Sequence, residues 1–280
     1  LLLEGFFSAY EVKVCSQMNI SAVIHNTQQI DFINQIKPKN PINIHLKINT
    51  GMNRLGFPPS KVKSLIQSLE KSPYIGNIIL MTHFANADEA IGVRDQLALF
   101  NKVVDDSFDR SVANSAAIIR YPETHMEWVR PGIMLYGASP FEDQSSQDIG
   151  LQPVMSLHSN IIAVQNLDKG QSVGYGSTFV APNKMRVGIV ACGYADGYPR
   201  HAPSGTPVMV AGKISRTLGR VSMDMLYVDL TDIPSADIHS EVELWGANIS
   251  VDEVAKQAKT VGYELLCAIS SSIRVPMEYA

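Results

Sequence analysis

The sequence predicts an α/β protein of two domains. A (β/α)8 barrel of the TIM type, without its first two βα units, is expected over residues 1–143, and a mainly β domain over residues 144–280. Two observations predict this division. In the first part, nearly continuous apolar segments alternate with amphipathic segments of helical period, which is typical of a parallel sheet covered by helices. After about Pro140, short apolar segments are separated by Gly, Pro, Asp and Asn, as in all-β domains.

Six strands are expected in the first domain, at residues 1–7, 22–25, 42–48, 78–83, 111–114 and 128–136. Amphipathic helices lie between most of them, among them "TQQIDFINQIK" and "SKVKSLIQSLEKS". Six βα units suit an open doubly wound sheet, whereas a closed barrel needs two more. Because the chain starts with the apolar run "LLLEGFF", we expect the two further units to precede Leu1.

The second domain is expected to hold short strands in "HSNIIAVQNL", "RVGIVACGY", "TPVMVAGK", "DMLYVDL" and "EVELWG". Such a pattern is shared by sandwiches and barrels, so both architectures stay open. One helix is expected at about residues 251–259. The polar segment "SPFEDQSSQDIG" is the expected domain boundary.

Composition argues against several classes of function. The net charge is −4 and the pI is about 6.0, so no basic surface indicates nucleic acid or an anionic membrane as a partner. No apolar run reaches the roughly 18 residues of a membrane helix, and no signal peptide is visible. The three cysteines form no CxxC pair, which predicts a reduced, metal-free protein of the cytoplasm.

Polar residues at four expected strand ends are candidates for function, because TIM-type barrels place their sites at the carboxyl ends of the strands. They are Lys47 and Arg54 in "HLKINTGMNRLGF", His83 in "LMTHFANADE", Asn114 and Ser115 in "VANSAA", and Arg130 in "WVRPGIMLYG". If the strand expected at residues 1–7 is the third of eight, Ser115 follows strand seven and Gly132 follows strand eight. Barrels often bind phosphate with backbone amides of these loops, so we expect a phosphorylated ligand.

The segments also resemble a known family. In the right order, "HLKINTGMNRLGF", "THFANADE", "ANSAA", "VRPGIMLYG", "SVGYGSTF", "GYADGYPR" and "GRVSMDM" resemble the signature blocks of alanine racemases, along nearly the whole chain. The resemblance implies an isomerase that interconverts L- and D-alanine with pyridoxal 5'-phosphate (PLP), for cell-wall peptidoglycan in the bacterial cytoplasm. It also implies a homodimer with shared active sites, and no nucleic acid or membrane partner.

The resemblance implies roles for particular residues. Tyr175 matches the catalytic tyrosine, which comes from the β domain of the partner subunit, and His83 matches a histidine that tunes it. Arg130 matches the arginine that faces the pyridine nitrogen of PLP and weakens the cofactor as an electron sink. Arg54 resembles the arginine near the phenolic oxygen of PLP and the substrate carboxylate. Lys47 resembles a lysine that is often carbamylated to hold that arginine.

Further positions follow from the same blocks. Expected to bind the cofactor phosphate are Asn114, Ser115, Gly132 and Ile133; expected in the substrate pocket are Met223 and Tyr194; and expected along the access corridor are Tyr194, Asp88, Arg200 and Arg220. Taken singly, Tyr175 is as well explained as a turn aromatic, His83 as a core histidine and Lys47 as an edge lysine. The order of the blocks favours the functional interpretation.

The sequence departs from the family in two places. The family's PLP lysine lies in a block like "VVKANAYGHG", which this chain lacks, so we expect the 280 residues alone to be inactive or nearly so. In "CAISSSIRVP", Ile273 stands where some members have a tyrosine near the phosphate. Two alternatives follow: a serine or broad-specificity racemase on the same scaffold, and a non-catalytic truncated homologue that binds PLP or a partner.

Overall fold

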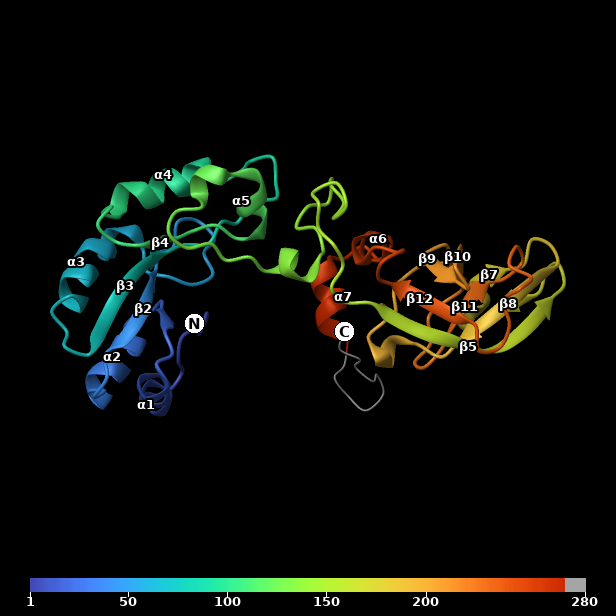
Figure 1. The fold of residues 1–280 in the computed structure, drawn as a ribbon, viewed down its shortest axis with the longest axis horizontal. Coiled ribbons are helices and arrows are strands. Elements are labelled where there is room, and N and C mark those ends of the chain that lie inside the picture. Colours follow the sequence, from blue (N-terminus) through green and yellow to red (C-terminus); the bar gives the residue numbers. More distant parts are fainter. Residues whose placement is uncertain (270–280) are drawn as a thin grey trace. The chain divides into compact units, whose positions relative to one another are not determined.

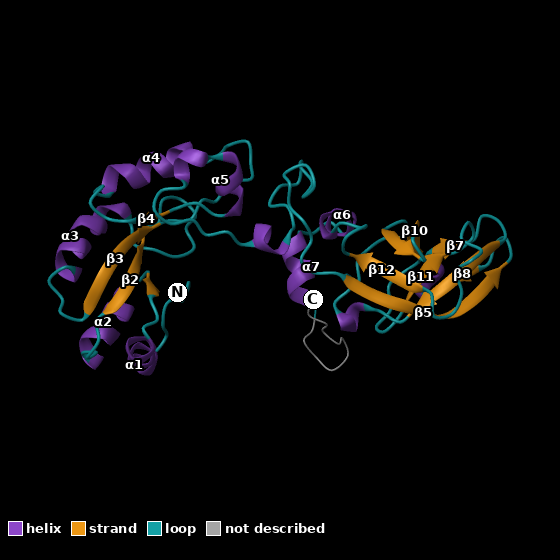
Figure 2. Cartoon of the chain, in the orientation of Figure 1, coloured by secondary structure: helices purple, strands orange, loops and turns teal. Residues whose placement is uncertain are grey.

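The computed structural model describes residues 1–269 and divides the chain into two compact units, Leu1–Gly132 and Ile133–Ala280. Each unit is described by itself. The first combines strands and helices, and the second consists mainly of strands (Figure 1, Figure 2). Along the chain, the first unit ends at Gly132, whereas the sequence predicts a boundary after residue 143.

A parallel sheet forms the centre of the first unit. Its order is β1 (Ala22–Ile24), β2 (Ile42–Lys47), β3 (Ile75–Met81) and β4 (Arg110–Ser111). The helices that alternate with it are α1 (Ala9–Met18), α2 (Thr27–Ile36), α3 (Pro59–Leu69), α4 (Arg94–Val103) and α5 (Ser115–Arg120), followed by the 3₁₀ turn η1 (Pro122–Thr124). Figure 1 shows α2, α3 and α4 along the same outer side of the strands. The unit thus keeps the strand–helix order of a TIM-type domain.

Two of the six expected strands do not form. The segments 1–7 and 128–136 each contribute only a one-residue parallel bridge, Leu2 to Ala22 and Trp128 to Ser111. Gly5 has φ of 72°, which turns the chain away from the sheet. Pro131 has no N–H to continue a ladder, and the 3₁₀ turn η2 (Ile133–Tyr136) follows. Within residues 1–269 the sheet of this unit is therefore open and four-stranded rather than closed.

The fifth expected strand, 111–114, is also shorter than predicted. The strand β4 ends at Ser111, because Asn114 already caps the next helix. The Asn114 side chain accepts a hydrogen bond from the backbone N–H of Ala117 at 3.0 Å, which is the usual N-cap geometry. The cap places the start of α5 directly behind the end of β4.

The second unit is built on a closed antiparallel barrel, which decides between the two architectures left open by the sequence. Around the barrel the order is β10 (Lys213–Leu218), β11 (Leu226–Asp229), β8 (Met185–Val190), β5 (Leu157–Leu167), β12 (Glu241–Trp245) and β9 (Pro207–Val210). The expected helix forms as α6 (Val251–Gln257), and a second helix, α7 (Gly262–Ala268), follows it. Inside the core, the rings of Tyr198 and Trp245 stack with their centroids 5.9 Å apart.

A two-stranded sheet, β6 (Ser172–Val173) and β7 (Phe179–Val180), lies beside this barrel. Val173 packs in a small cluster of buried apolar residues with Met185, Val187 and Leu218. The cluster fixes both ends of the short segment between β6 and β7. That segment carries Tyr175 in the 3₁₀ turn η3 (Tyr175–Ser177).

Candidate functional site

Four of the predicted site residues belong to one group at the carboxyl ends of the strands in the first unit. We call Lys47, Arg54, His83 and Arg130 the strand-end cluster. Lys47 is the last residue of β2, His83 follows β3 by two residues, and Arg130 follows the bridge that pairs with β4. Arg130, Arg54 and Lys47 each act electrostatically on His83. Parallel strands bring these ends together at one edge of the sheet, as predicted.

Arg130 is held by backbone and hydroxyl oxygens. Its Nη1 donates to the carbonyl oxygen of Ser111 at 2.7 Å and to the Ser111 Oγ at 2.8 Å, and its Nη2 donates to the carbonyl oxygen of Thr82 at 2.7 Å. Burial lowers the pKa of Arg130 to about 10, so it stays charged at neutral pH. All of these acceptors are neutral. Arg130 is therefore a fixed cation that ties the ends of β3 and β4 together.

Lys47 and His83 respond to this concentration of positive charge. Burial, with repulsion from Arg54 and Arg130, lowers the pKa of Lys47, whose side chain is 6% exposed. Burial, with repulsion from Arg130, Arg54 and Lys47, lowers the pKa of His83 from 6.5 to about 4. His83 is therefore a neutral imidazole at pH 7. A neutral imidazole can accept a hydrogen bond as well as donate one.

The sequence analysis missed His45, which lies two residues before Lys47 on β2. Residues two apart on a strand share a face, so His45 lies on the same side of the sheet as Lys47. Its Nδ1 is buried without a hydrogen-bond partner among residues 1–269. Burial and the charge of Arg130 lower the pKa of His45 from 6.5 to about 4. The alternation of polar His45 and Lys47 within an apolar strand was the available signal.

These histidines predict a loss of stability in weak acid. Between pH 6.5 and about 4, an unfolded chain protonates histidines that the folded chain keeps neutral, so the free energy of unfolding falls as the pH falls. From pH 7 to pH 5 the loss due to His45 is about 2 kcal/mol. We expect urea unfolding of the cofactor-free protein to show a smaller loss in His45→Gln than in the parent. His201→Gln, at an exposed histidine, is the control. An equal loss in the parent and His45→Gln would contradict the assignment.

The residues predicted to bind phosphate lie around the start of α5. Ser115 is buried, and its Oγ accepts the backbone N–H of Gly132 at 2.7 Å. Because this hydroxyl accepts from Gly132, its own proton is available for an outward hydrogen bond. The Asn114 side chain donates to the carbonyl oxygen of Phe84 at 3.4 Å. Gly132 is the last residue of the first unit. Ile133 is buried and begins the second unit.

Asp88 lies apart from the strand-end cluster, on the exposed segment before α4. Its carbonyl oxygen accepts a hydrogen bond from the Arg120 side chain at 2.7 Å. This contact holds the β3–α4 segment against α5. Asp88 is exposed, and its place along an access corridor stays a prediction.

In the second unit, Tyr175 is presented on a turn with its side chain 74% exposed. Gly174 and Gly176 on either side have φ of 69° and 73°, a conformation that favours glycine. A Cβ on Gly176 would come within 3.3 Å of the Arg220 guanidinium. Arg220 and Tyr175 therefore belong to the same exposed surface of this unit.

Tyr194 and Met223 are joined through their backbones. The Tyr194 N–H donates to the carbonyl oxygen of Ser222 at 3.1 Å, and the next N–H, of Ala195, donates to that of Met223 at 3.0 Å. The Arg200 guanidinium lies over the Tyr194 ring, 5.9 Å from its centroid. Arg200 and Arg220 also line one surface pocket, together with Thr178, His201 and Ser204. The second unit thus gathers its predicted substrate and corridor residues around the Tyr175 turn.

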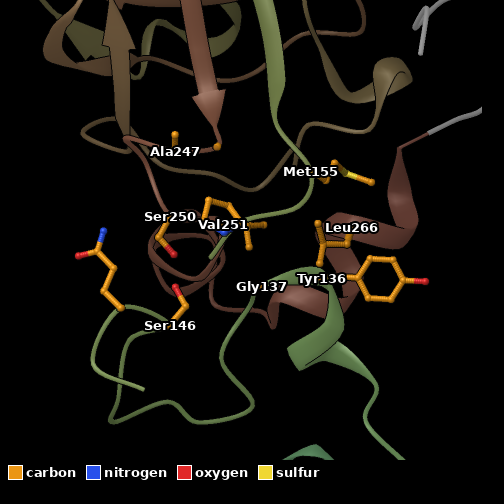
Figure 3. A pocket seen from close by; sticks show the side chains of 11 residues that line it. Tyr136, Gly137, Ser146, Met155, Ala247, Ser250, Val251 and Leu266 are labelled. Atoms are coloured by element: carbon orange, nitrogen blue, oxygen red, sulfur yellow. The ribbon is translucent and has the colours of Figure 1, made fainter. Parts of the chain in front are cut away.

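A second pocket, shown in Figure 3, contains none of the predicted site residues. Ser146 and Ser250 extend toward one another there, and Tyr136, Met155 and Leu266 supply apolar walls. Its volume of about 20 Å³ suits a water molecule rather than a substrate. Within residues 1–269, no group of His, Cys, Asp or Glu side chains is arranged to hold a metal ion, and no helix is long and apolar enough to cross a membrane.

Comparisons with known proteins find the same relatives over both units. Sequence models described as "Alanine racemase, N-terminal domain" and "Alanine racemase, C-terminal domain" match residues 1–140 and 154–279. The alanine racemase of Thiobacillus denitrificans is 51% identical over 279 residues, covering 99% of this chain and 76% of that protein. The crystal structure of biosynthetic alanine racemase from Pseudomonas aeruginosa is similar with a TM-score of 0.95 and 46% identity, covering 100% of this chain and 78% of that one.

A more distant relative of known structure contains a bound cofactor. The crystal structure of alanine racemase from Bartonella henselae with covalently bound pyridoxal phosphate is similar with a TM-score of 0.82 and 26% identity. The match covers 96% of this chain and 76% of that chain. The N-terminal domain model matches from residue 1, which gives no support to the expected absence of two βα units and of a lysine segment. That expectation and the expected inactivity stay predictions, and Ile273 lies outside the described residues.

Proposed function

The chain belongs to the alanine racemase family, and on that premise we propose that it interconverts L- and D-alanine with the help of PLP. The strand-end cluster carries the proposal. It gathers Lys47, Arg54 and Arg130 around a neutral histidine, and none of the three cations forms an ion pair with a carboxylate within residues 1–269. Lys47 is buried, Arg130 is half-buried and Arg54 is exposed, and a group of cations without an acidic partner favours an anionic ligand.

The residues present fit PLP on this ground. The Ser115 Oγ accepts the Gly132 N–H and keeps its own proton free, which suits a phosphate, and Asn114 holds the loop that carries Ser115. PLP, when bound, acidifies the α-proton of an amino acid by withdrawing electrons. We propose that Arg130 faces the pyridine nitrogen of PLP. Because the cation of Arg130 is fixed by three short hydrogen bonds, it disfavours a proton on that nitrogen and so moderates the electron withdrawal.

We assign Arg54 to the substrate carboxylate and the phenolic oxygen of PLP, with Lys47 behind it. The lowered pKa of Lys47 increases the fraction of free amine, which is the form that reacts with carbon dioxide. In that step the amine nitrogen forms an N–C bond with carbon dioxide and loses one proton to solvent, so the neutral amine becomes a carbamate anion that can pair with Arg54. One carbon dioxide retained on the Lys47 peptide, and lost in Lys47→Ala, would support the assignment by mass spectrometry; an unmodified peptide from native protein would contradict it.

We assign the proton transfer on one face of the α-carbon to the Tyr175 hydroxyl of the partner subunit in a homodimer. The unperturbed pKa of tyrosine is about 10, so the hydroxyl needs help to act as a base near neutrality. His83, as a neutral imidazole beside Arg130, is suited to accept that hydroxyl's hydrogen bond. Met223 and Tyr194 would border the substrate, and Asp88, Arg200 and Arg220 would line its path. The product is D-alanine for peptidoglycan, made in the cytoplasm.

The experiment is a racemisation assay of the full-length protein with PLP. We expect both enantiomers of alanine to be converted to the same mixture, and serine to be converted at least about tenfold more slowly in kcat/KM, a discrimination within reach of a pocket that must reject one extra hydroxyl. Chiral chromatography measures both substrates. The protein without PLP is the control. Equal or faster conversion of serine would favour the broad-specificity alternative, and turnover of neither would favour a non-catalytic homologue.

A further inference from the structure

A buried glutamine, which the sequence does not indicate as a site residue, connects the loop that carries Arg54 with the segment that carries His83. Gln96 lies on α4 and is 8% exposed. Its Oε1 accepts the backbone N–H of Ala85 at 2.7 Å. Its Nε2 donates to the carbonyl oxygen of His83 and to the Thr50 Oγ1, both at 3.2 Å. Gln96 thus uses its acceptor and both of its donors.

The hydrogen-bond network continues from Thr50, and the donor and acceptor of each bond in it are determined. The hydroxyls of Thr50 and Thr82 are 2.7 Å apart, and the Thr82 hydroxyl donates to the carbonyl oxygen of Ile48 at 2.9 Å. Because each hydroxyl has one proton, Thr50 must donate to Thr82 and accept from Gln96. The backbone carbonyl of Thr82 accepts from Arg130. A single buried chain of hydrogen bonds therefore runs from α4 to the ends of β2 and β3 and to the arginine.

The loop that carries Arg54 begins at this chain. Its ends are closed by two backbone hydrogen bonds, from Asn49 to Phe57 at 2.9 Å and from Phe57 to Lys47 at 2.8 Å. Thr50 is the second residue of the loop, and its side chain is 5% exposed. The Gln96 contact therefore fixes this loop relative to the segment that holds His83.

We propose that Gln96 is a positioning residue, which sets the Arg54 loop and the His83 segment in register with each other for proton transfer at the α-carbon. What is positioned rests on the proposed function, but the hydrogen bonds do not. Fully satisfied buried networks of this kind hold a unique arrangement, and loss of one member leaves buried groups unpaired. A displacement of about 1 Å between catalytic groups is enough to lower a rate substantially.

The chain offers a matched control in Gln29 on α2. It is 2% exposed, its Oε1 accepts the backbone N–H of His25 at 2.8 Å, and its Nε2 donates to the carbonyl oxygens of Glu4 and Phe6 at 3.2 and 3.3 Å. Like Gln96, it joins two neighbouring segments by one accepted and two donated hydrogen bonds, but both of its acceptors are carbonyl oxygens. None of its partners is a predicted site residue. A purely structural role would make the two glutamines equivalent.

The test compares Gln96→Ala with Gln29→Ala in the full-length holoenzyme. We expect both variants to lower the midpoint of thermal unfolding, but only Gln96→Ala to lower kcat for alanine, by about tenfold or more. Assays of correctly folded fractions, checked by gel filtration, measure the difference. Equal losses of kcat in both variants, or no loss in Gln96→Ala, would overturn the positioning role.

A second readout does not depend on turnover. In Gln96→Glu the acceptor for Ala85 is kept, and a carboxylate is placed beside His83, which faces Arg130, Arg54 and Lys47. We expect the pKa of His83, followed by NMR and assigned with His83→Gln, to rise from about 4 toward its ordinary value, while Gln29→Glu leaves it unchanged. An unchanged pKa in Gln96→Glu would overturn the proposed contact. If the parent holoenzyme does not racemise alanine, the proposed function fails, and this titration still decides the role of Gln96.

Discussion

Tyr175→Phe is expected to lower kcat for alanine by about 10²–10⁴-fold in both directions, the usual contribution of a positioned acid–base group. Phenylalanine keeps the ring and removes only the hydroxyl that would carry the proton. Because the Tyr175 side chain is 74% exposed on its turn, the free energy of unfolding should change by no more than about 0.5 kcal/mol. Initial rates from L- and D-alanine, with solvent deuterium uptake at the α-carbon, measure the loss.

The control for this variant is Tyr10→Phe. Tyr10 lies on α1, is 71% exposed, and belongs to no predicted site. We expect its rates to stay within about twofold of the parent, as for other exposed positions away from the site. Full racemisation by Tyr175→Phe in both directions would refute the assignment of Tyr175. Loss in one direction of exchange only would still assign one face of the α-carbon to it.

Arg130→Met is expected to damage both folding and activity. The substitution removes the cation and leaves the Ser111 hydroxyl and the carbonyl oxygen of Thr82 without this donor, so the free energy of unfolding should fall by about 3 kcal/mol. Racemisation of alanine should fall by about 10²-fold or more, because the residue proposed to hold the cofactor ring loses its charge and its fixed hydrogen bonds. Urea unfolding and initial rates measure the two effects.

Two variants separate these effects. Arg186 on β8 also donates to backbone carbonyls, those of Ala236 and Ile233, in the second unit. Arg186→Met should therefore lower stability and leave kcat within about twofold. Arg130→Lys keeps a positive charge but loses the planar fork, and should retain more activity than Arg130→Met. If Arg130→Met and Arg186→Met lose kcat equally, Arg130 has only a structural role.

The position of the strand-end cluster in the fold follows from local sequence patterns. Lys47, His83 and Arg130 each interrupt or end an apolar segment, and parallel strands necessarily bring their carboxyl ends to one edge. The sequence did not show where pairing stops. The runs at residues 1–7 and 128–136 are as apolar as true strands, and only Gly5 and Pro131 mark the breaks.

Other features depend on contacts between distant segments. Gln96 stands in "RDQLALFNKV", where a polar residue on an amphipathic helix normally faces solvent. Its burial is decided by Thr50, which is 46 residues away in the chain. The choice of a barrel over a sandwich likewise depends on the pairing of β9 with both β10 and β12. Local periodicity is the same in both architectures.

The positive charges of the strand-end cluster have a thermodynamic consequence for the whole unit. Burial lowers the pKa of Lys47 most, and Arg54 and Arg130 lower it further, which means that these groups repel one another in the folded chain. An anion bound among them relieves that repulsion only when the chain is folded. By linkage, such an anion stabilises the native state by an amount that grows with its concentration above its dissociation constant. Affinity for the anion and resistance to unfolding are therefore two measures of the same electrostatic free energy.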